Sequence, residues 1–263
     1  MRLLTDRLRW VFLAAAGLLL LAWLLETPPG LLGKADAIAY AVCHRIASHS
    51  FSIEDRQFPL CARCTGMYLG ALLGLAYSFR TKIRAGFPPR RLLAVLVLFV
   101  LAFGIDGVNS YAGIIIQNPL LYTSTNTLRL LTGTFFGAVV GVYLAAAFNQ
   151  AVWTEFDSRP ALGSFRQLAL LVGLGLGIDL GVLSGNPLLL IPLALLAAGG
   201  VLALLTLAYS MVWTLILKRE NMGRSWRGMW LPLAAGFSTA LVQIILVDGL
   251  RMALTGTWSG FSL

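Results

Sequence analysis

Long apolar stretches alternate with short polar connections along almost the whole chain. Seven of them approach the roughly 20 apolar residues that a helix needs to cross a bilayer, namely Trp10–Leu25, Cys61–Phe79, Arg91–Val108, Thr127–Phe148, Phe165–Leu183, Pro187–Ala208 and Leu231–Gly249. The sixth stays apolar as far as Leu217. The pattern predicts an all-α, polytopic membrane helical bundle of about seven transmembrane helices.

Composition supports a membrane protein and excludes other classes. Hydrophobic residues make up 58% of the 263 residues and charged residues 12%, about half the charged share of a soluble domain. The net charge of +9 lies in short clusters between apolar runs, so we interpret it as a topology signal rather than a nucleic-acid surface. No phosphate-binding loop or nucleotide fingerprint occurs. We expect a multi-pass protein of the cell (plasma) membrane that contacts lipid, with no nucleic acid or nucleotide partner and with protein partners that the sequence does not reveal.

The basic clusters predict the orientation, because cytoplasmic loops carry an excess of Lys and Arg. Basic residues precede the first run and follow the second, fourth and sixth runs: Arg2, Arg7, Arg9; Arg80, Lys82, Arg84, Arg90, Arg91; Arg159, Arg166; Lys218, Arg219, Arg224, Arg227. This places the N-terminus in the cytoplasm and the C-terminus outside. The first run resembles a signal peptide, but "ETPPG" follows it instead of a small-residue cleavage site, so we expect an uncleaved anchor.

We therefore expect a single membrane domain over residues 1–263, with four parts. Residues 1–30 form an N-terminal anchor helix, and residues 31–60 form an outer amphipathic segment and loop. Residues 61–148 form a core of three spans, and residues 149–263 contain the last three. Within the outer segment, Ala39, Cys43, Ile46 and Ser50 share one face, which predicts one interfacial helix reaching Ser50.

Two of the apolar runs resemble each other in their glycines. "CTGMYLGALLG" and "LTGTFFGAVVG" both have glycine at every fourth position, a spacing that lets helix backbones approach closely. The packing faces comprise Gly66, Gly70 and Gly74 on one helix and Gly133, Gly137 and Gly141 on the other. Each glycine-faced helix is paired along the chain with a helix that ends in an aspartate, Asp106, Asp179 or Asp248. We therefore interpret the chain as one anchor helix plus three similar helical hairpins.

All three cysteines and both histidines of the chain lie in one outer stretch, "AVCHRIASHSFSIEDRQFPLCARCTG". Cys61 and Cys64 have the spacing of a two-thiolate clamp, and Cys43 with His44 can complete a Cys₃His set for zinc or another thiophilic metal. Cys43 and His44 point about 100° apart on a helix, so one of them must be displaced to share a metal. His49 is the alternative fourth ligand.

Two other chemistries fit the same cysteines. Cys61 and Cys64 begin a helix beside Arg63, where a thiolate is stabilised, so the protein could be a membrane thiol–disulfide oxidoreductase coupled to quinone. Alternatively, the cysteines form a structural disulfide in a small-solute or lipid transporter whose path is lined by the three aspartates. Residue patterns leave these three readings open, and whether the protein is an enzyme is undecided.

A set of polar residues lies near the outer ends of the third and fourth runs, comprising Asp106, Asn109, Asn126 and Arg129. Charged groups at membrane depth are costly unless they are paired. We expect an Asp106–Arg129 ion pair, a helix N-cap at Thr125, and a polar outer cavity under the cysteine cluster. Asp179 and Asp248 either join this cavity or cap helix ends.

The stretch "CHRIASHSFSIEDRQFPLCARCTGMYLG", followed by "IDGVNS" and "STNTLRLLTG", resembles an uncharacterised prokaryotic integral membrane protein family, domain of unknown function 2085. The match covers roughly Cys43 to Gly141, so the three-span core is the family-like part. The resemblance implies a prokaryotic membrane protein and supports one unit formed by Cys43, His44, Cys61, Cys64, Asp106, Asn126 and Arg129. The family commonly has a basic residue where this chain has His49, which leaves His44 as the better histidine ligand. The resemblance supplies no reaction.

Overall fold

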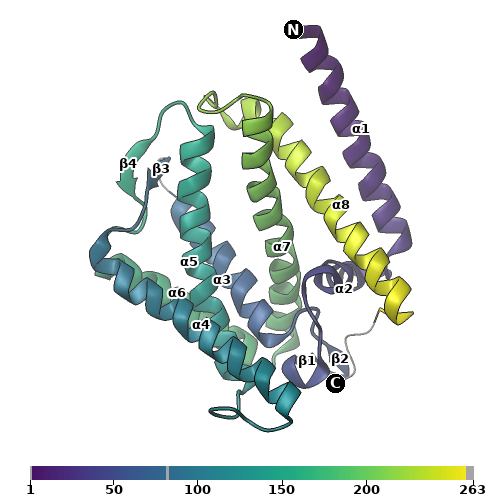
Figure 1. Ribbon diagram of the computed structural model, residues 1–263, viewed down its shortest axis with the longest axis vertical. Helices are drawn as coiled ribbons and strands as arrows, with labels where there is room; N and C mark the ends of the chain where they lie inside the picture. Colours follow the sequence, from purple (N-terminus) through teal and green to yellow (C-terminus); the bar gives the residue numbers. More distant parts are fainter. Residues whose placement is uncertain (1, 81–82, 259–263) are drawn as a thin grey trace.

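The computed structural model describes residues 2–80 and 83–258 and is a bundle of α-helices (Figure 1). Lys82, counted among the basic residues above, lies outside this part, as do the side chains of Arg2, Arg7 and Arg9. The α-helices are α1 (Arg2–Glu26), α2 (Gly30–Val42), α3 (Ala62–Phe79), α4 (Arg90–Ile116), α5 (Asn126–Val152), α6 (Phe165–Leu183), α7 (Pro187–Ile216) and α8 (Trp230–Thr255). Short 3₁₀ helices occupy Ala47–His49 and Trp226–Met229, and the strands are β1 (Ser52–Ile53), β2 (Arg56–Gln57), β3 (Arg84–Gly86) and β4 (Asp157–Pro160).

All seven apolar runs fold as helices, which confirms an all-α membrane helical protein. Within the described residues, five helical segments are long and apolar enough to cross a membrane: α4, α5, α6, α7 and the segment Trp226–Thr255. The number rises to six if α1 and α2, which meet at a 108° bend, form one broken span. The number seven therefore stays a prediction. Helix α3 is counted in neither case, and it contains glycines, tyrosines and Arg63 among its leucines.

The centre of the bundle is the close contact between α3 and α5. Ten of the 18 residues of α3 are buried, so this helix faces protein more than lipid and does not need a fully apolar surface. A Cβ added to any of the glycines predicted to pack would run into the backbone of the other helix, and this holds for Gly66, Gly70, Gly74, Gly133, Gly137 and Gly141. The two glycine faces therefore lie against each other, and the backbones approach at a distance that only glycine permits.

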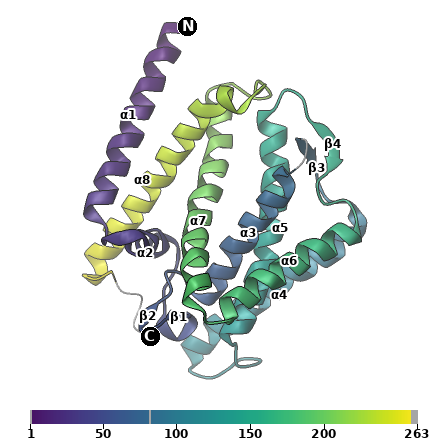
Figure 2. The same cartoon turned by 180° about the vertical axis from the view of Figure 1, so that it is seen from behind.

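The two ends of the bundle differ in character (Figures 1 and 2). The N-terminus of α1, the β3–β4 pair and the α7–α8 connection lie at one end, whereas the β1–β2 hairpin and the α4–α5 connection lie at the other. Strands β3 and β4 pair in parallel, with Arg84 opposite Asp157. The basic connections thus share an end with the N-terminus and the cysteine-bearing loop lies opposite. This arrangement agrees with the predicted orientation, which itself stays a prediction.

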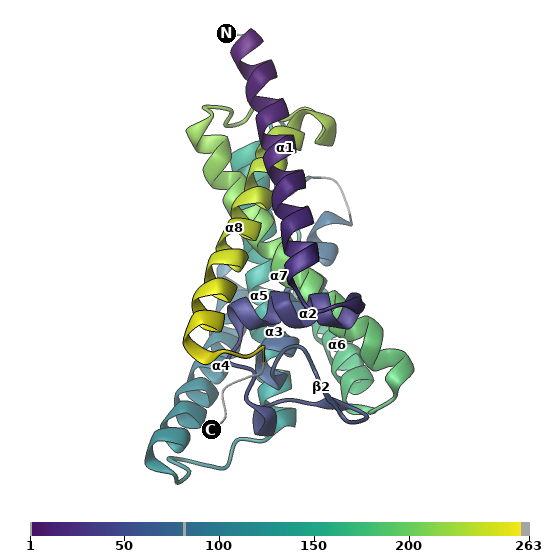
Figure 3. The same cartoon turned by 90° about the vertical axis from the view of Figure 1, so that its right-hand side faces the viewer.

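Two predicted boundaries are wrong. The outer amphipathic helix ends at Val42 instead of continuing to Ser50, because Cys43 is in extended conformation and Arg45 has a φ of +53°. Helix α2 lies across the bundle, nearly perpendicular to α1 (Figure 3). Helix α4 does not end at Asp106 but runs ten residues further, to Ile116. Asp106 is therefore an interior helical residue that is fully buried.

Candidate functional site

The cysteines are brought together by the loop between α2 and α3. Cys43 is the extended residue that ends α2, and the chain then folds through the 3₁₀ helix and the antiparallel β1–β2 hairpin. Phe58 and Leu60 are fully buried and anchor the returning chain. Cys61 follows as the residue before the first turn of α3, and Cys64 lies within that turn. The loop therefore returns Cys61 and Cys64 to Cys43.

The three sulfurs form one compact group. The Sγ atoms of Cys43, Cys61 and Cys64 all lie within 4.8 Å of one another. Cys43 and Cys61 are buried, with 5% and 2% of their surface exposed, and Cys64 is partly buried. All three are free thiols in this structure. Such a group can hold a metal ion, and the thiols are also close enough to form a disulfide after a small movement.

Backbone amides point at the sulfur of Cys43. The N–H groups of Cys61 and Arg45 donate to its Sγ at 3.3 Å and 3.4 Å. The pKa of the Cys43 thiol is held well below its usual range, because the Cys61 and Cys64 thiols and these two amides donate hydrogen bonds that favour the thiolate. Cys43 is thus prepared to carry negative charge although it is buried.

An arginine from the last helix fixes this loop. The Nη1 atom of Arg251 donates to the carbonyl oxygens of Tyr40 and Cys43 at 2.6 Å, and Nη2 donates to the carbonyl of His44 at 3.1 Å. Its guanidinium also stacks on the Tyr40 ring, 4.0 Å from the centroid. Arg251 is not among the cysteine-site residues expected from the sequence, which placed it only near Asp248, although a lone arginine at the outer end of an apolar run is a signal that could have included it.

Hydrogen bonds and an ion pair within the outer segment also hold the cysteine loop. Gln57 donates to the carbonyl of Arg45 at 2.8 Å and to the Ser50 hydroxyl at 2.9 Å. Arg45 forms an ion pair with Asp36 of α2 at 2.8 Å. All these partners lie within the outer segment. The sequence did not identify the pairs, because an ion pair or hydrogen bond between them depends on how the loop folds.

The histidines lie beside the thiols without joining their group. Nδ1 of His44 accepts the backbone N–H of Ile46 at 3.0 Å, and the His44 and His49 rings meet edge to face at 5.7 Å. Burial lowers the pKa of His44, and it lowers the pKa of His49 to about 4 with help from the Arg129 charge. Both rings are therefore neutral near pH 7. His44 as a metal ligand stays a prediction.

The expected Asp106–Arg129 ion pair is wrong. Asp106 pairs with Arg63 of α3, whose Nη2 also donates to the Asp106 carbonyl at 3.0 Å. The other carboxylate oxygen accepts the hydroxyls of Ser124 and Tyr122 at 2.7 Å and 3.1 Å. Arg63 reaches Asp106 because the tight α3–α5 contact brings the start of α3 beside the middle of α4. The guanidinium of Arg63 is thus committed to Asp106.

Arg129 has neutral partners instead. It donates from Nε and Nη2 to Ser110 at 3.3 Å and 3.2 Å, and from Nη1 to Asn126 at 2.8 Å. Asn126 in turn donates to the carbonyls of Ser48 and Ser50 at 3.3 Å, which ties α5 to the cysteine loop. Thr125 caps α5 as expected, accepting the N–H of Leu128 at 3.2 Å.

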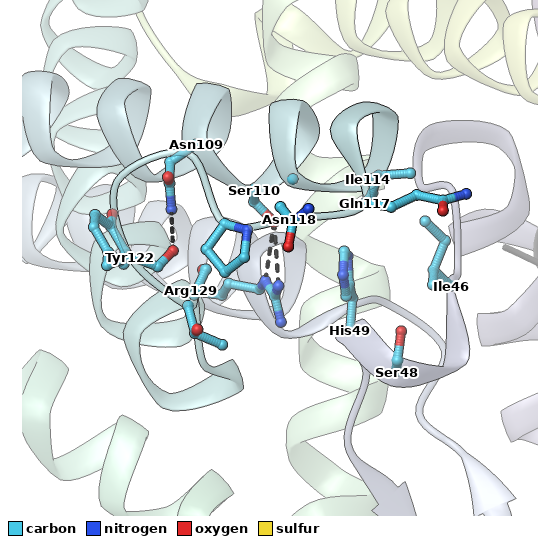
Figure 4. Close-up of a pocket in the computed structure, with 14 residues that line it drawn as sticks. Ile46, Ser48, His49, Asn109, Ser110, Ile114, Gln117, Asn118, Tyr122 and Arg129 are labelled. Atoms are coloured by element: carbon cyan, nitrogen blue, oxygen red, sulfur yellow. Dashed lines mark hydrogen bonds between the residues drawn. The ribbon is translucent and has the colours of Figure 1, made fainter.

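A polar cavity of about 530 Å³ lies between the cysteine loop and the α4–α5 connection (Figure 4). Asn109 and Arg129 line it, as do Ile46, Ser48 and His49 from the loop. Asn109 holds the connection in place by donating to the carbonyl of Tyr122 and accepting from the amide of Leu121, both at 2.8 Å. An outer polar cavity is therefore present next to the loop.

The other two aspartates lie elsewhere. Asp179 is buried and accepts the hydroxyl of Thr134 at 2.6 Å, and Asp248 lines a different cavity, of about 340 Å³, with Trp23 of α1. Neither lines the polar cavity next to the cysteine loop. The three aspartates therefore occupy three separate surroundings.

Comparison with known proteins places the chain in a family. Residues 43–143 match the family model described as "Predicted membrane protein (DUF2085)". An uncharacterised protein of Methanocaldococcus jannaschii is 30% identical over 121 residues, which cover 46% of this chain and 72% of that protein. An uncharacterised protein of Methanothermobacter thermautotrophicus is 36% identical over 92 residues, which cover 35% of this chain and 74% of that protein. No solved structure matches significantly.

The matched region contains the cysteines, Arg63, Asp106, Asn126 and Arg129 together with α3, α4 and most of α5. It is thus the part of the chain that holds the thiol group, its polar neighbours and the central helix contact. This chain matches more than two thirds of the length of each relative. The chain therefore belongs to the family of predicted membrane proteins designated DUF2085.

Proposed function

We propose that the protein binds a thiophilic metal ion, zinc first among the candidates, through Cys43, Cys61 and Cys64 at the outer face of the cell membrane. The observation that carries this proposal is the approach of three sulfurs to within 4.8 Å of one another, although Cys43 precedes Cys61 by 18 residues. Buried thiols gather in this way when they share a ligand or a bond.

The geometry of the group fits a tetrahedral ion. Zinc binds thiolates at about 2.3 Å, which places sulfurs in a tetrahedral site about 3.8 Å apart. Sulfurs that lie within 4.8 Å therefore need to move by only about 1 Å or less. The movement is small because Cys61 is the N-cap residue of α3 and Cys64 lies in the first turn of the same helix.

The surroundings also favour a thiolate at Cys43. Two backbone amides donate to its sulfur, and the neighbouring Cys61 and Cys64 thiols add to this effect. Outer contacts of this kind orient ligands and tune a metal centre. Arg251 adds to the order of the loop by holding the Cys43 carbonyl.

Three protein ligands leave a fourth position for water, a substrate or His44. His44 follows Cys43 directly, and its Nδ1 accepts the Ile46 amide, which leaves the ring proton on Nε2. Coordination through either nitrogen would therefore require this hydrogen bond to break. An open fourth position is typical of reactive zinc sites, whereas four protein ligands are typical of structural ones. The role of His44 therefore separates a reactive metal centre from a structural one.

Elemental analysis tests the proposal. The protein is purified in mild detergent without chelator, beside a Cys61→Ser/Cys64→Ser variant and a His49→Gln control, which alters a neighbouring side chain outside the thiol group. We expect about one metal ion per chain in the wild type and the control, and none in the cysteine variant. A His44→Gln variant that keeps its metal would assign the fourth position to water or substrate. A metal-free wild type would contradict the proposal.

A thiol–disulfide oxidoreductase coupled to quinone is the second candidate, and the same approach of three sulfurs favours it. Two thiols would lose two electrons and two protons to the quinone, forming a disulfide and a quinol, and the third thiol would exchange with the disulfide. In this case the purified wild type would contain no metal. Mass spectrometry after alkylation would then find one disulfide that forms and opens with the redox state of added quinone.

The outward orientation has its own test. Asp55 lies exposed in the hairpin at the cysteine end, and Glu220 lies exposed in the α7–α8 connection at the opposite end. A membrane-impermeant thiol reagent applied to intact cells should label an Asp55→Cys variant and should not label a Glu220→Cys variant until the cells are lysed. The reverse pattern would place the thiol group in the cytoplasm.

A further inference from the structure

We infer that the polar cavity between the cysteine loop and the α4–α5 connection binds an oxyanion, a phosphate or carboxylate group, through the guanidinium of Arg129. The cavity has a volume of about 530 Å³, which lies within the usual size range of small-molecule sites. Figure 4 shows Arg129, Ser110, Asn118 and His49 gathered around the same space. The inference is independent of the metal and rests on the charge balance and the lining of this cavity.

The charges around the cavity do not cancel. Two guanidinium groups, those of Arg63 and Arg129, lie near one carboxylate, that of Asp106, and its oxygens are occupied by Arg63, Ser124 and Tyr122. Only 7% of Arg129 is exposed, and all its hydrogen-bond partners in the described part of the chain are neutral. A buried charge without a counter-charge is costly. One positive charge therefore remains to be compensated, and it faces the cavity.

The lining suits an anion. Among the described residues that line the cavity, none is acidic. Ser48, Gln117, Asn118 and Thr123 add hydroxyl and amide groups to the wall, and such neutral donors complete the coordination of an oxyanion. Arg129 uses three of its five N–H groups on Ser110 and Asn126, so two are left for a ligand. A guanidinium fork matches the oxygens of carboxylate and phosphate groups.

Apolar residues next to the cavity lining in sequence indicate two sources for such a group. Exposed apolar side chains continue from the end of α4 into the α4–α5 connection: Ile115, Ile116, Leu120 and Leu121, which are 52% to 70% exposed. A lipid phosphate in the cavity could lay its acyl chains over this surface. A free anion would use the cavity alone. The shared chemistry is the oxyanion, and the experiment distinguishes the sources.

Thermal unfolding of the full-length protein in a neutral detergent tests the site. Inorganic phosphate is titrated at constant ionic strength against chloride, and phosphatidic acid is compared with diacylglycerol of the same acyl chains. A ligand that binds the folded state raises Tm. We expect a rise in Tm of the wild type with phosphate, with phosphatidic acid or with both, and the active ligand identifies the source.

Two variants decide whether this cavity is responsible. Arg129→Gln should weaken binding by about tenfold or more, because it removes charge-assisted hydrogen bonds. Gly113→Leu leaves every charge in place and obstructs part of the cavity, because Gly113 lines it and a Cβ there meets only the Asn118 carbonyl oxygen, at 3.6 Å. An Arg166→Gln control, at the start of α6, should respond like the wild type. If Arg129 were only structural, Arg129→Gln would lower Tm but keep its response to phosphate.

The inference fails if neither phosphate nor phosphatidic acid stabilises the wild type. It also fails if Arg129→Gln or Gly113→Leu responds as strongly as the wild type. Repeating the titration in the Cys61→Ser/Cys64→Ser background separates the cavity from a bound metal. The response should persist there, and its loss would show that a metal at the thiols, rather than Arg129, holds the anion.

Discussion

Replacing Gly70 with alanine should separate α3 from α5 at the centre of the bundle. A Cβ at this position would lie 2.8 Å from the carbonyl carbon and 2.9 Å from the Cα of Thr134, and closer still to the Thr134 carbonyl oxygen. All three are backbone atoms of α5, so no side chain can rotate to make room. The added methyl group can be accommodated only by moving one helix.

The size of the effect follows from these distances. Ordinary van der Waals contact begins at 3.4 Å, so the backbones must separate by about 0.6 Å or more. Overpacking of this kind costs about 1–3 kcal/mol, and the better helix propensity of alanine returns up to about 1 kcal/mol. We expect a net loss of about 1–2 kcal/mol. For a chain of this size, that corresponds to a fall in Tm of about 2–8 °C.

The cysteines provide the assay. Cys43 and Cys61 are buried, so a fluorogenic thiol reagent reacts with them mainly after unfolding, and its signal on heating gives Tm in detergent. Gly107→Ala is the matched control, because Gly107 is also helical but a Cβ there meets nothing within 4 Å. The control should be unchanged or slightly stabilised. Equal Tm values for the two variants would refute the close packing of α3 against α5.

Three further predictions concern the site. Arg251→Gln should lower metal affinity by about 10- to 100-fold, measured by competition with a chelator, because it frees the carbonyls that fix the cysteine loop; unchanged affinity would show that this clamp is dispensable. Stability should fall as pH drops from about 6.5 to about 4, because the folded-state pKa of His49 is lowered to about 4 and unfolded chains take up that proton first. His49→Gln should flatten this slope in thermal melts across that range, and an unchanged slope would assign it to other groups. A double-mutant cycle of Asp106→Asn with Arg63→Gln should give a coupling energy of about 1–3 kcal/mol, larger than that of Asp106→Asn with Arg129→Gln; the opposite order would restore the pairing expected from sequence.

The sequence singled out the three cysteines that the structure brings together, but it did not identify the partner of Asp106. The cysteines and the polar set Arg63, Asp106, Asn109, Asn126 and Arg129 stand out because such groups are rare in an apolar chain. Which charge meets Asp106 depends on where α3 begins relative to the middle of α4, and sequence spacing does not encode that offset. Arg251 was left out for the same reason, since it reaches the cysteine loop from the other end of the chain.

The sequence by itself determined the class of the protein and the positions of its main helices. Hydrophobic runs of about 20 residues can satisfy their backbone hydrogen bonds in lipid only as helices, so every run that was predicted helical is helical. The sequence also marked the glycine faces, because glycine at every fourth position in an apolar helix has a packing consequence. Local rules of this kind act within one helix and need no knowledge of neighbours.

Tertiary structure decided everything that depends on contacts between distant segments. It ended the outer helix at Val42, where Cys43 turns to meet Cys61 and Cys64, and it extended α4 past Asp106, whose carboxylate is satisfied by α3 and the α4–α5 connection. Local propensity favoured a helix through Cys43 and a helix end at Asp106. Burial of sulfur and charge outweighs such preferences, because a buried polar group without partners costs several times more than a local propensity returns.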